Sequence, residues 1–216
     1  MFLEMDALDG HQRYKLMSAA IVPRPIAWVS SLSTTGIGNV APYSFFNMMG
    51  SSPPLLVLGT MRQADGRLKD TAQNILDTGE FVVNLVGEAS LEAMNLTCAD
   101  APPDIDEAEL AGLALDDSCI VHPKRIVGAP VSFECRLRQH IDAPPETLIL
   151  IGEVVAMHID DHFVDPATLR LDPVAMGLVG RVHGPGAYTR IAIHRQLDRP
   201  LYADLAKGTS VRDSID

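Results

Sequence analysis

The segment Lys69-Asp70-Thr71 is the first candidate for binding chemistry in this chain of 216 residues. It stands at the start of a run that predicts a helix over Asp70–Thr78, with apolar residues at i, i+3, i+4 spacing. The first amides of a helix have no partner within the helix, and Lys69 adds a positive charge, so the segment could bind a phosphate group. Thr71 and Asn74 can add side-chain donors.

Asp70 offers an alternative at the same position. Its carboxylate could act as the N-cap of the helix, with Gln73 three residues later completing a capping box and Gly79 ending the helix. The segment would then be an ordinary capped helix rather than an anion site. The residues alone leave both interpretations open.

The stretch Asn39–Asn47 (NVAPYSFFN) is the second candidate. It combines amides, hydroxyls, a proline and aromatic rings directly after the glycine-rich turn Thr34–Asn39. Pro42 and the bend would leave backbone polar groups free to hydrogen-bond a planar heterocycle, with Tyr43 and the two phenylalanines as apolar walls. An aromatic core segment is the alternative.

Other motifs carry less weight. Gly36–Ala41 fits the G-x-G-x-x-A dinucleotide pattern, but Pro42 and the residues after it do not begin an amphipathic helix. His158 and His162 would share one face of a helix, whereas the pattern before them predicts a strand, in which residues four apart lie about 13 Å from each other. We therefore expect a polar strand end and no metal site. The chain contains no G-x-S-x-G and no Walker A motif, so nothing indicates nucleophilic or metal-dependent hydrolysis.

The charge balance is acidic, with 17 basic and 28 acidic residues and a net charge of −11. Such a chain would repel phosphate, so we expect neither nucleic acid nor an anionic membrane as a partner. Seven acids and no base lie between Ala99 and Ser118, which predicts a solvated surface segment. These acids are Asp100, Asp104, Asp106, Glu107, Glu109, Asp116 and Asp117.

The location is predicted from the cysteines and the N-terminus. Cys98, Cys119 and Cys135 form an odd set without a C-x-x-C motif, so we expect reduced, mostly buried thiols and neither a disulfide framework nor a cysteine-based zinc site. Two acids near Met1 do not fit an export signal, and no apolar stretch reaches the roughly 20 residues of a membrane span. A cytoplasmic protein is expected.

Short strand patterns separated by turns predict a mainly β protein, a barrel or a sandwich, rather than a parallel α/β fold. The expected strands are Ile26–Ser33, Phe45–Gly50, Leu55–Met61, Glu80–Val86, Pro130–Ile141 and Thr147–Ile159. Beside the helix Asp70–Thr78, a helical pattern covers Glu88–Thr97, and a short helix is expected within Ala101–Leu115.

Several motifs in register make the chain similar to a known family. They are Pro23–Ser31 (PRPIAWVSS), Gly38-Asn39, Ala41–Asn47 (APYSFFN), Pro53-Pro54-Leu55, Lys69-Asp70-Thr71, Asn74 and Gly79–Asn84 (GEFVVN). In this order and at this spacing they resemble the flavin reductase-like, FMN-binding split-barrel proteins, with the flavoredoxin branch closest. The resemblance covers roughly residues 15–192.

The resemblance implies an antiparallel, Greek-key-like split β-barrel with flanking helices. It also implies a homodimer that binds FMN at or near the subunit interface. We expect one domain over residues 1–195 and a C-terminal tail over residues 196–216, in which Pro200-Leu201-Tyr202 could dock on the body or on a partner subunit.

The same resemblance assigns the residues of the site. It implies that Ser30 and Ser31 lie near the flavin or its ribityl chain, and that Lys69 and Thr71, with Arg24 and Asn74, bind the phosphate. The isoalloxazine edge would be lined by Asn39, Ala41, Pro42, Tyr43, Ser44 and Phe45. Arg181–Tyr188 looks like the family's late Arg-x-x-Gly-x-x-x-Tyr segment, so Arg181 or His183 could meet a substrate or a nicotinamide, although His183 could equally be a polar loop residue.

The expected function is an FMN-dependent oxidoreductase. Electrons would pass from NAD(P)H through FMN to a flavin, a protein or a small-molecule acceptor, and the flavin would do the chemistry without a dedicated catalytic side chain. The alternative is an FMN-containing electron carrier reduced by another protein, with the acidic segment Asp100–Asp117 as its docking surface. A flavin-free barrel that acts as a binding or scaffold protein is a third interpretation.

Overall fold

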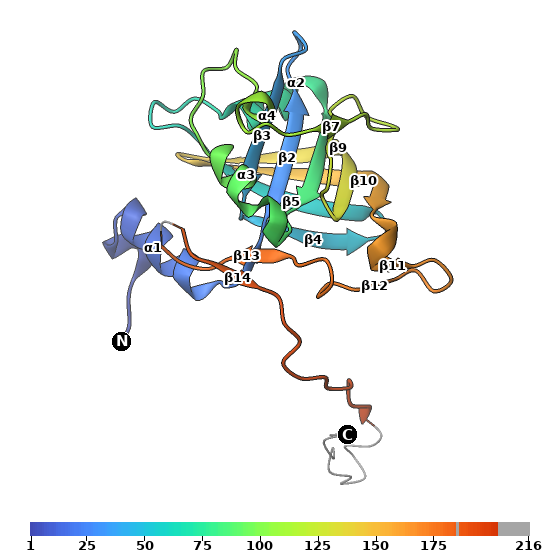
Figure 1. Cartoon of the computed structure of the whole chain (residues 1–216). Helices are drawn as coiled ribbons and strands as arrows, with labels where there is room; N and C mark the ends of the chain where they lie inside the picture. Colours follow the sequence, from blue (N-terminus) through green and yellow to red (C-terminus); the bar gives the residue numbers. More distant parts are fainter. Residues whose placement is uncertain (185, 203–216) are drawn as a thin grey trace.

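One antiparallel sheet forms the body of the computed structural model, which describes residues 1–184 and 186–202 (Figure 1). The seven strands follow the order β3-β2-β6-β9-β10-β5-β4. Their bounds are β2 Ala27–Leu32, β3 Gly38–Tyr43, β4 Phe46–Ser51, β5 Pro54–Met61, β6 Glu80–Leu85, β9 Val131–Ala143 and β10 Thr147–Ile159. Each strand predicted from the sequence is present, and the mainly β prediction is confirmed.

The two end strands of the sheet, β3 and β4, are connected directly by the chain. These strands lie at opposite ends of the sheet order but are consecutive in the chain, separated only by Ser44 and Phe45. The amide of Gly59 in β5 donates a hydrogen bond of 2.7 Å to the carbonyl of Phe45. Strand β6 lies between the β2–β3 and β9–β10 hairpins. The result is an antiparallel barrel in which, among the described residues, β3 and β4 are linked by the chain but are not paired with each other.

Side-chain alternation along β2 divides the core into two clusters. Ala27 and Val29 face the barrel interior, where helix α2 (Asp70–Thr78) contributes Ala72 and Ile75. Trp28 faces the opposite side, where it packs with residues of helices α3 (Leu91–Leu96) and α4 (Glu107–Leu110). Each face of β2 is therefore covered by different helices, which makes the face of each neighbouring residue decisive for the site.

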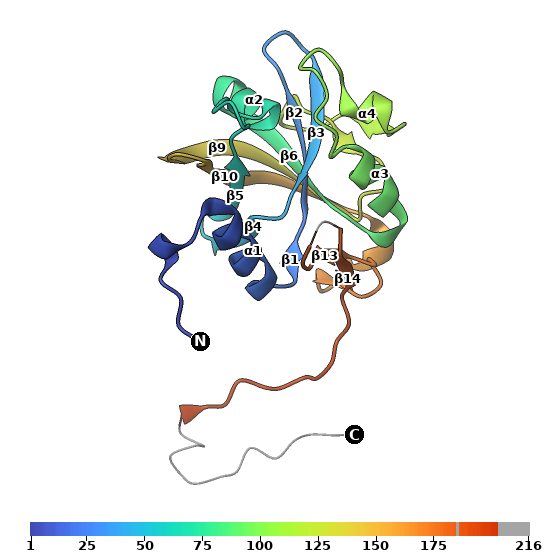
Figure 2. The same ribbon diagram turned by 90° about the vertical axis from the view of Figure 1, so that its left-hand side faces the viewer.

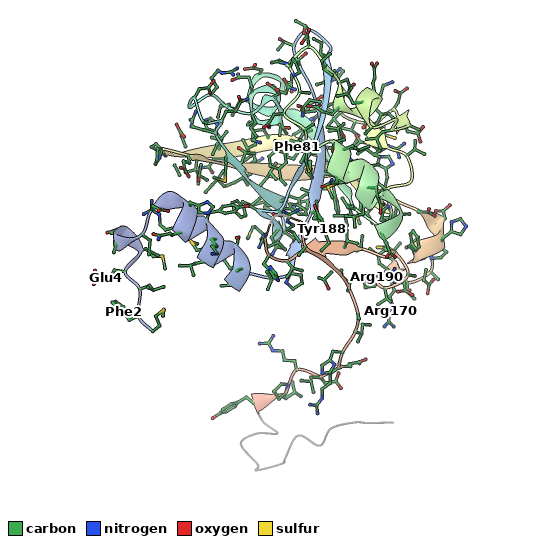
Figure 3. The ribbon with its side chains drawn as sticks, turned by 60° about the vertical axis from the view of Figure 1, so that its left-hand side comes forward. Phe2, Glu4, Phe81, Arg170, Tyr188 and Arg190 are labelled. Atoms are coloured by element: carbon green, nitrogen blue, oxygen red, sulfur yellow. The ribbon has the colours of Figure 1, made fainter. Side chains whose placement is uncertain are left out.

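Phe81 of β6 fills the barrel interior and is 1% exposed (Figure 3). Gly152 of β10 leaves the space for its ring, because a Cβ atom at Gly152 would lie 2.4 Å from Phe81 Cζ. The glycine is therefore required by a close approach rather than by a turn.

Smaller elements surround the barrel. Helix α1 (Gly10–Ala20) and the three-stranded sheet β1-β13-β14 lie together at one end of it (Figure 2). The remaining pieces are β1 Arg24–Pro25, β13 Val179–Arg181, β14 Tyr188–Arg190, the pair β7 Leu115–Asp116 and β8 Arg125–Ile126, the pair β11 Val164–Asp165 and β12 Arg170–Leu171, and the 3-10 turns η1 Met5–Ala7, η2 Glu88–Ser90 and η3 Asp161–Phe163. None of the described helices is long and apolar enough to cross a membrane.

The chain extends away from the barrel after β14 (Figure 2). Leu197, Leu201 and Tyr202 are exposed. The predicted tail, residues 196–216, is described as far as residue 202, and its separation from the domain stays a prediction.

Two local predictions are wrong. Lys69, not Asp70, is the N-cap of α2, and no side chain bonds to that cap. The capping box of this protein belongs instead to α1, where Asp9 and Gln12 bond to each other's backbone amides. The cysteines were expected to be mostly buried, but only Cys135 is, because it points into the barrel from β9.

Candidate functional site

The N-terminus of α2 is open. Its first helical hydrogen bond runs from Gln73 N to Lys69 O over 3.0 Å, so the amides of Asp70, Thr71 and Ala72 have no acceptor within the helix. These amides and the helix dipole favour an anion, and no carboxylate caps them. The anion-site interpretation of this segment is therefore favoured over the capped-helix interpretation.

A cavity of about 430 Å³ lies against this end of the helix. Its size falls within the roughly 300–1,000 Å³ of small-molecule sites. The walls are formed by Asn39, Ala41, Pro42, Tyr43, Gln63, Arg67, Lys69, Asp70, Thr71, the segment 97–103 and Glu107. Six residues expected to contact the cofactor are among them: Asn39, Ala41, Pro42, Tyr43, Lys69 and Thr71.

A cluster of buried, hydrogen-bonded polar side chains lies next to this cavity. Asn39 Nδ2 donates to Thr71 Oγ1 over 2.7 Å and lies 3.4 Å from Ser31 Oγ, to which Asn74 Nδ2 also donates over 3.2 Å. Ser31 and Asn39 are register partners in the β2–β3 hairpin, so both side chains emerge on the face that α2 covers. The structure thus joins two separate sequence motifs in one hydrogen-bonded unit.

Tyr43 forms the apolar wall of the cavity. Burial raises the pKa of its phenol well above the ordinary value, and a hydrogen bond with Thr71 opposes this only in part. Burial therefore favours the neutral form of the phenol. Strand β3 is at one end of the sheet order, so among the described strands it pairs with β2 on one side and is an edge strand on the other. An edge strand tolerates a proline such as Pro42.

Charged residues of both signs line the cavity. Lys69 Nζ lies 3.7 Å from Asp100 Oδ1, and both side chains are solvent-accessible. Arg67 Nε bonds to Asp65 Oδ2 over 2.6 Å. Sequence reasoning missed Arg67 and treated its segment only as a turn. The signal was a second basic residue two positions before Lys69.

Glu107 corrects the expectation that the whole acidic segment is solvated. It is 6% exposed, and its Oε2 accepts a hydrogen bond of 3.1 Å from Val40 N. Burial raises the pKa of Glu107 above its ordinary value. The reason is tertiary, because α4 packs against β3 and turns this one carboxylate toward the backbone of the strand.

A second cavity of about 200 Å³ adjoins the first and shares Pro42, Tyr43 and Cys98 with it. Arg181 lines it and donates to Tyr188 Oη over 2.6 Å and to Gly184 O over 3.2 Å. The guanidinium carbon lies 4.9 Å from the centre of the Tyr188 ring. Ser44 also lines this cavity. Arg181 therefore lines a cavity that adjoins the one at Lys69.

Arg24 and Phe45 lie elsewhere. Arg24 is buried, and its guanidinium donates to Ser44 Oγ over 3.3 Å and to the carbonyls of Ser18 and Ile21 at the end of α1. Burial lowers its pKa. Phe45 packs toward Tyr14, with the ring centres 6.1 Å apart. Neither lines the cavity of Lys69, so within one chain they do not form its walls.

Ser30 and His183 are also outside the two cavities. Ser30 Oγ donates to Lys124 O over 2.6 Å and accepts from Asn84 Nδ2 over 3.1 Å, so it stabilises the opposite face of β2. His183 is exposed and lines neither cavity. The two histidines His158 and His162 do not face each other, because His158 bonds to Glu134 and His162 to Asp160.

Together, the barrel and this site define a protein of the flavin reductase type, and the comparison with known families agrees. Residues 17–176 match the flavin reductase like domain, so the chain belongs to this family. The family resemblance of the sequence is confirmed.

Solved structures show the same relationship. Nitrilotriacetate monooxygenase component B from Bacillus cereus is 32% identical, with a TM-score of 0.87 over 91% of this chain and 98% of that one. The Pseudomonas fluorescens 2-nitrobenzoate 2-nitroreductase NbaA is 37% identical, with a TM-score of 0.84 over 94% and 98%. A candidate flavin reductase with a split barrel domain from Shewanella frigidimarina, 20% identical, has a TM-score of 0.78 over 93% and 100% and shows the fold alone. The split-barrel prediction is confirmed, and flavoredoxin has this fold too.

The residues of the cavity fit a flavin mononucleotide. Such a molecule needs an anion site for its phosphate, polar partners along its chain and a flat apolar surface for its ring system. The open N-terminus of α2 with Lys69, the cluster around Asn39 and the wall at Tyr43 provide these in one connected space. The family and the site together support flavin binding and a flavin-related oxidoreductase.

Proposed function

We propose that the protein is an FMN-dependent oxidoreductase that takes electrons from NAD(P)H and delivers them to a flavin, a protein or a small molecule. The observation that carries the proposal is the cavity in which the uncapped end of α2 meets the edge strand β3. A phosphate site alone would suit many ligands. Its union with an apolar wall and a buried amide cluster favours a flavin.

Lys69, Thr71 and the first amides of α2 bind the phosphate in this proposal. Asn39 and Asn74 are held by Ser31 and Thr71, so their side chains are fixed before the cofactor arrives. A fixed polar site loses little entropy on binding. Arg67 and Gln63 line the same cavity, and they add donors that the sequence reasoning did not assign.

The ring system of the flavin would lie along Ala41–Tyr43, next to the smaller cavity that contains Arg181. When bound, FMN supplies the chemistry by accepting a hydride from NAD(P)H and passing two electrons to an acceptor. Tyr43 stays neutral and excludes water from the ring edge. Arg181, held by Tyr188, would orient an anionic group of the nicotinamide nucleotide or of the acceptor. His183 is a weaker candidate for this role.

Two acceptors follow from the related proteins. One is another component of a monooxygenase, which the Bacillus cereus relative suggests by its designation as nitrilotriacetate monooxygenase component B. The other is an aromatic nitro compound, as in the Pseudomonas fluorescens relative. Arg181 beside the ring site suits the carboxylate of a nitrobenzoate.

We further propose that the chain acts as a homodimer. A groove of about 550 Å³ between α1, β4 and β5 has a mainly apolar lining. Tyr14, Met17, Ile21, Phe45 and Met49 of this groove are all exposed in the single chain. Apolar patches of this kind are typical of protein interfaces. The cytoplasmic location and the absence of nucleic-acid and membrane partners stay predictions from the composition.

An anaerobic absorption spectrum of the FMN-reconstituted protein tests the function. The flavin bands are expected to bleach when NADH or NADPH is added and to return with 2-nitrobenzoate or free FMN as acceptor. The nucleotide that bleaches faster is the donor. Failure of the protein to retain or reduce FMN would contradict the proposal.

A flavin that binds but stays oxidised with both nucleotides would favour the alternative, an electron carrier reduced by another protein. One observation supports this alternative. Asp100 lines the cavity, and Asp104 near it is exposed, so a basic partner could dock beside the flavin.

A further inference from the structure

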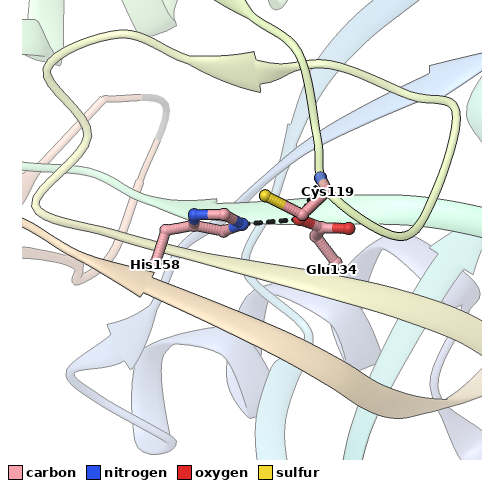
Figure 4. A group of neighbouring side chains, drawn as sticks. All are labelled: Cys119, Glu134 and His158. Carbon is pink, nitrogen blue, oxygen red and sulfur yellow. Dashed lines mark hydrogen bonds and ion pairs between the residues drawn. The ribbon is translucent and has the colours of Figure 1, made fainter.

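A second cluster of chemically active side chains lies outside the flavin site. Cys119 comes from the loop between β7 and β8, Glu134 from β9 and His158 from β10 (Figure 4). One ligand atom from each residue lies within 4.8 Å of those of the other two. None of the three lines either cavity of the flavin site.

We propose that Cys119, Glu134 and His158 bind a divalent metal ion of the zinc class. A thiolate, an imidazole and a carboxylate form a mixed donor set that suits Zn²⁺ better than hard ions such as Mg²⁺ or Ca²⁺. Three protein ligands leave a fourth position for water, as in catalytic rather than structural zinc sites.

The geometry needs only small movements. Tetrahedral zinc with bonds of about 2.0–2.3 Å separates its ligand atoms by roughly 3.5 Å. His158 Nε2 and Glu134 Oε1 are 2.5 Å apart, so this pair must open by about 1 Å. The thiol must close by a similar amount from at most 4.8 Å. Cys119 is exposed and His158 is partly exposed, so both side chains can move and an ion can enter from solvent.

The burial and the hydrogen bonds of the Glu134 carboxylate suit it to bind a cation. Its side chain is fully buried, and the one ion-pair partner that the described part of the chain gives it is His158, which is charged only when protonated. The backbone amides of Cys119, Ile120 and Val121 donate to its two oxygens over 2.6–3.0 Å. Such hydrogen bonds to a ligating carboxylate fix its orientation.

The arrangement also explains why the sequence did not reveal this site. The pair His158 and His162 attracts attention in the sequence, yet His162 bonds to Asp160 and takes no part. The ligands are instead brought together by the β9–β10 ladder, where Glu134 pairs with Ala156, two residues before His158. Long-range pairing of this kind leaves no spacing motif.

The test uses the full chain with its flavin, first freed of metal by a chelator and then dialysed against Zn²⁺. We expect one zinc per chain by elemental analysis. Cys119→Ser and His158→Gln should each weaken binding by at least about 100-fold, beyond the 10–100-fold cost of losing an outer-shell partner. His162→Gln is the matched control and should bind as the unchanged chain does. Glu134 is left intact because three loop amides depend on it.

A second measurement does not depend on variants. In the flavin-free chain, zinc should protect Cys119 from alkylation, read by peptide mass spectrometry. The exposed Cys98 of the same molecule serves as the internal control there, because no flavin covers the cavity that it lines. Protection of Cys119 alone supports the proposal. No uptake of zinc, equal uptake by all variants, or equal protection of both cysteines would overturn it.

Discussion

Replacement of Lys69 by alanine is expected to weaken FMN binding by about 2- to 100-fold. A hydrogen bond to a charged group contributes about 1.5–3 kcal/mol. In the free protein Lys69 lies 3.7 Å from Asp100, with exposed fractions of 41% and 95% for the two side chains. Such an exposed pair contributes about 0.2–1 kcal/mol, which FMN binding must replace. The net loss is therefore about 0.5–2.8 kcal/mol, at 1.4 kcal/mol for each factor of ten.

The same reasoning predicts the opposite change in FMN affinity when Asp100, the ion-pair partner of Lys69, is replaced. Asp100→Asn removes the competitor for the ammonium group and should tighten FMN binding by about 1.5- to 5-fold. Both effects should shrink at high salt, because both groups are accessible to screening ions. The assay is the quenching of flavin fluorescence during titration of the apoprotein, with FMN and riboflavin compared at two ionic strengths.

Riboflavin distinguishes the role of Lys69 from a general effect on the cavity, because it lacks the phosphate. Lys69→Ala should weaken FMN binding and leave riboflavin binding unchanged. If both flavins lose affinity equally, Lys69 shapes the cavity without binding phosphate. If neither changes, the phosphate lies elsewhere and the anion site at α2 is refuted.

Three further changes test other parts of the structure, each by urea unfolding. Glu107→Gln should raise the free energy of unfolding at pH 7, because burial raises the pKa of this acid and the fold disfavours its charge. The gain should vanish below the pKa that Glu107 has in the unfolded chain. The control Glu109→Gln, at an exposed position, should show no gain at either pH. Gly152→Ala should destabilise the barrel by about 1–3 kcal/mol, since the new Cβ would meet Phe81, and an unchanged midpoint would contradict this packing. Ser30→Ala should cost about 1–3 kcal/mol, because it removes the hydrogen bonds with Lys124 O and Asn84 Nδ2, at about 0.5–1.5 kcal/mol each, while FMN affinity stays intact. A large loss of affinity would return Ser30 to the site.

The strands of the barrel were predictable because their pattern is local. The hairpin β9–β10 shows this best, since two long β-type runs flank Ala143–Glu146 with its two prolines. Helix α1 was missed for the opposite reason. Ser18 is its one buried residue, so no apolar stripe marks it in the sequence.

The site was predictable only in part. The motifs around Asn39 and Lys69, which the structure brings to one cavity, were singled out because the sequence resembles a family and because turns and helix starts have local signatures. The opposite wall of the cavity, from Thr97 to Pro103, lies in a loop whose position depends on tertiary contacts. Glu107 illustrates the limit: within an acidic run, its burial follows from the packing of α4 on β3, which no local pattern encodes.

The adjacent serines of β2 show why a motif is not yet a site. Both belong to the segment that carries the family resemblance, and the sequence alone does not distinguish them. In a strand, neighbouring side chains point to opposite faces. Ser31 therefore meets Asn39 and Asn74 beneath the cavity, whereas Ser30 meets Asn84 on the far face. The register of the β2–β3 hairpin decides which serine faces α2, so of these two neighbours in β2 only Ser31 lies on the side of the candidate site.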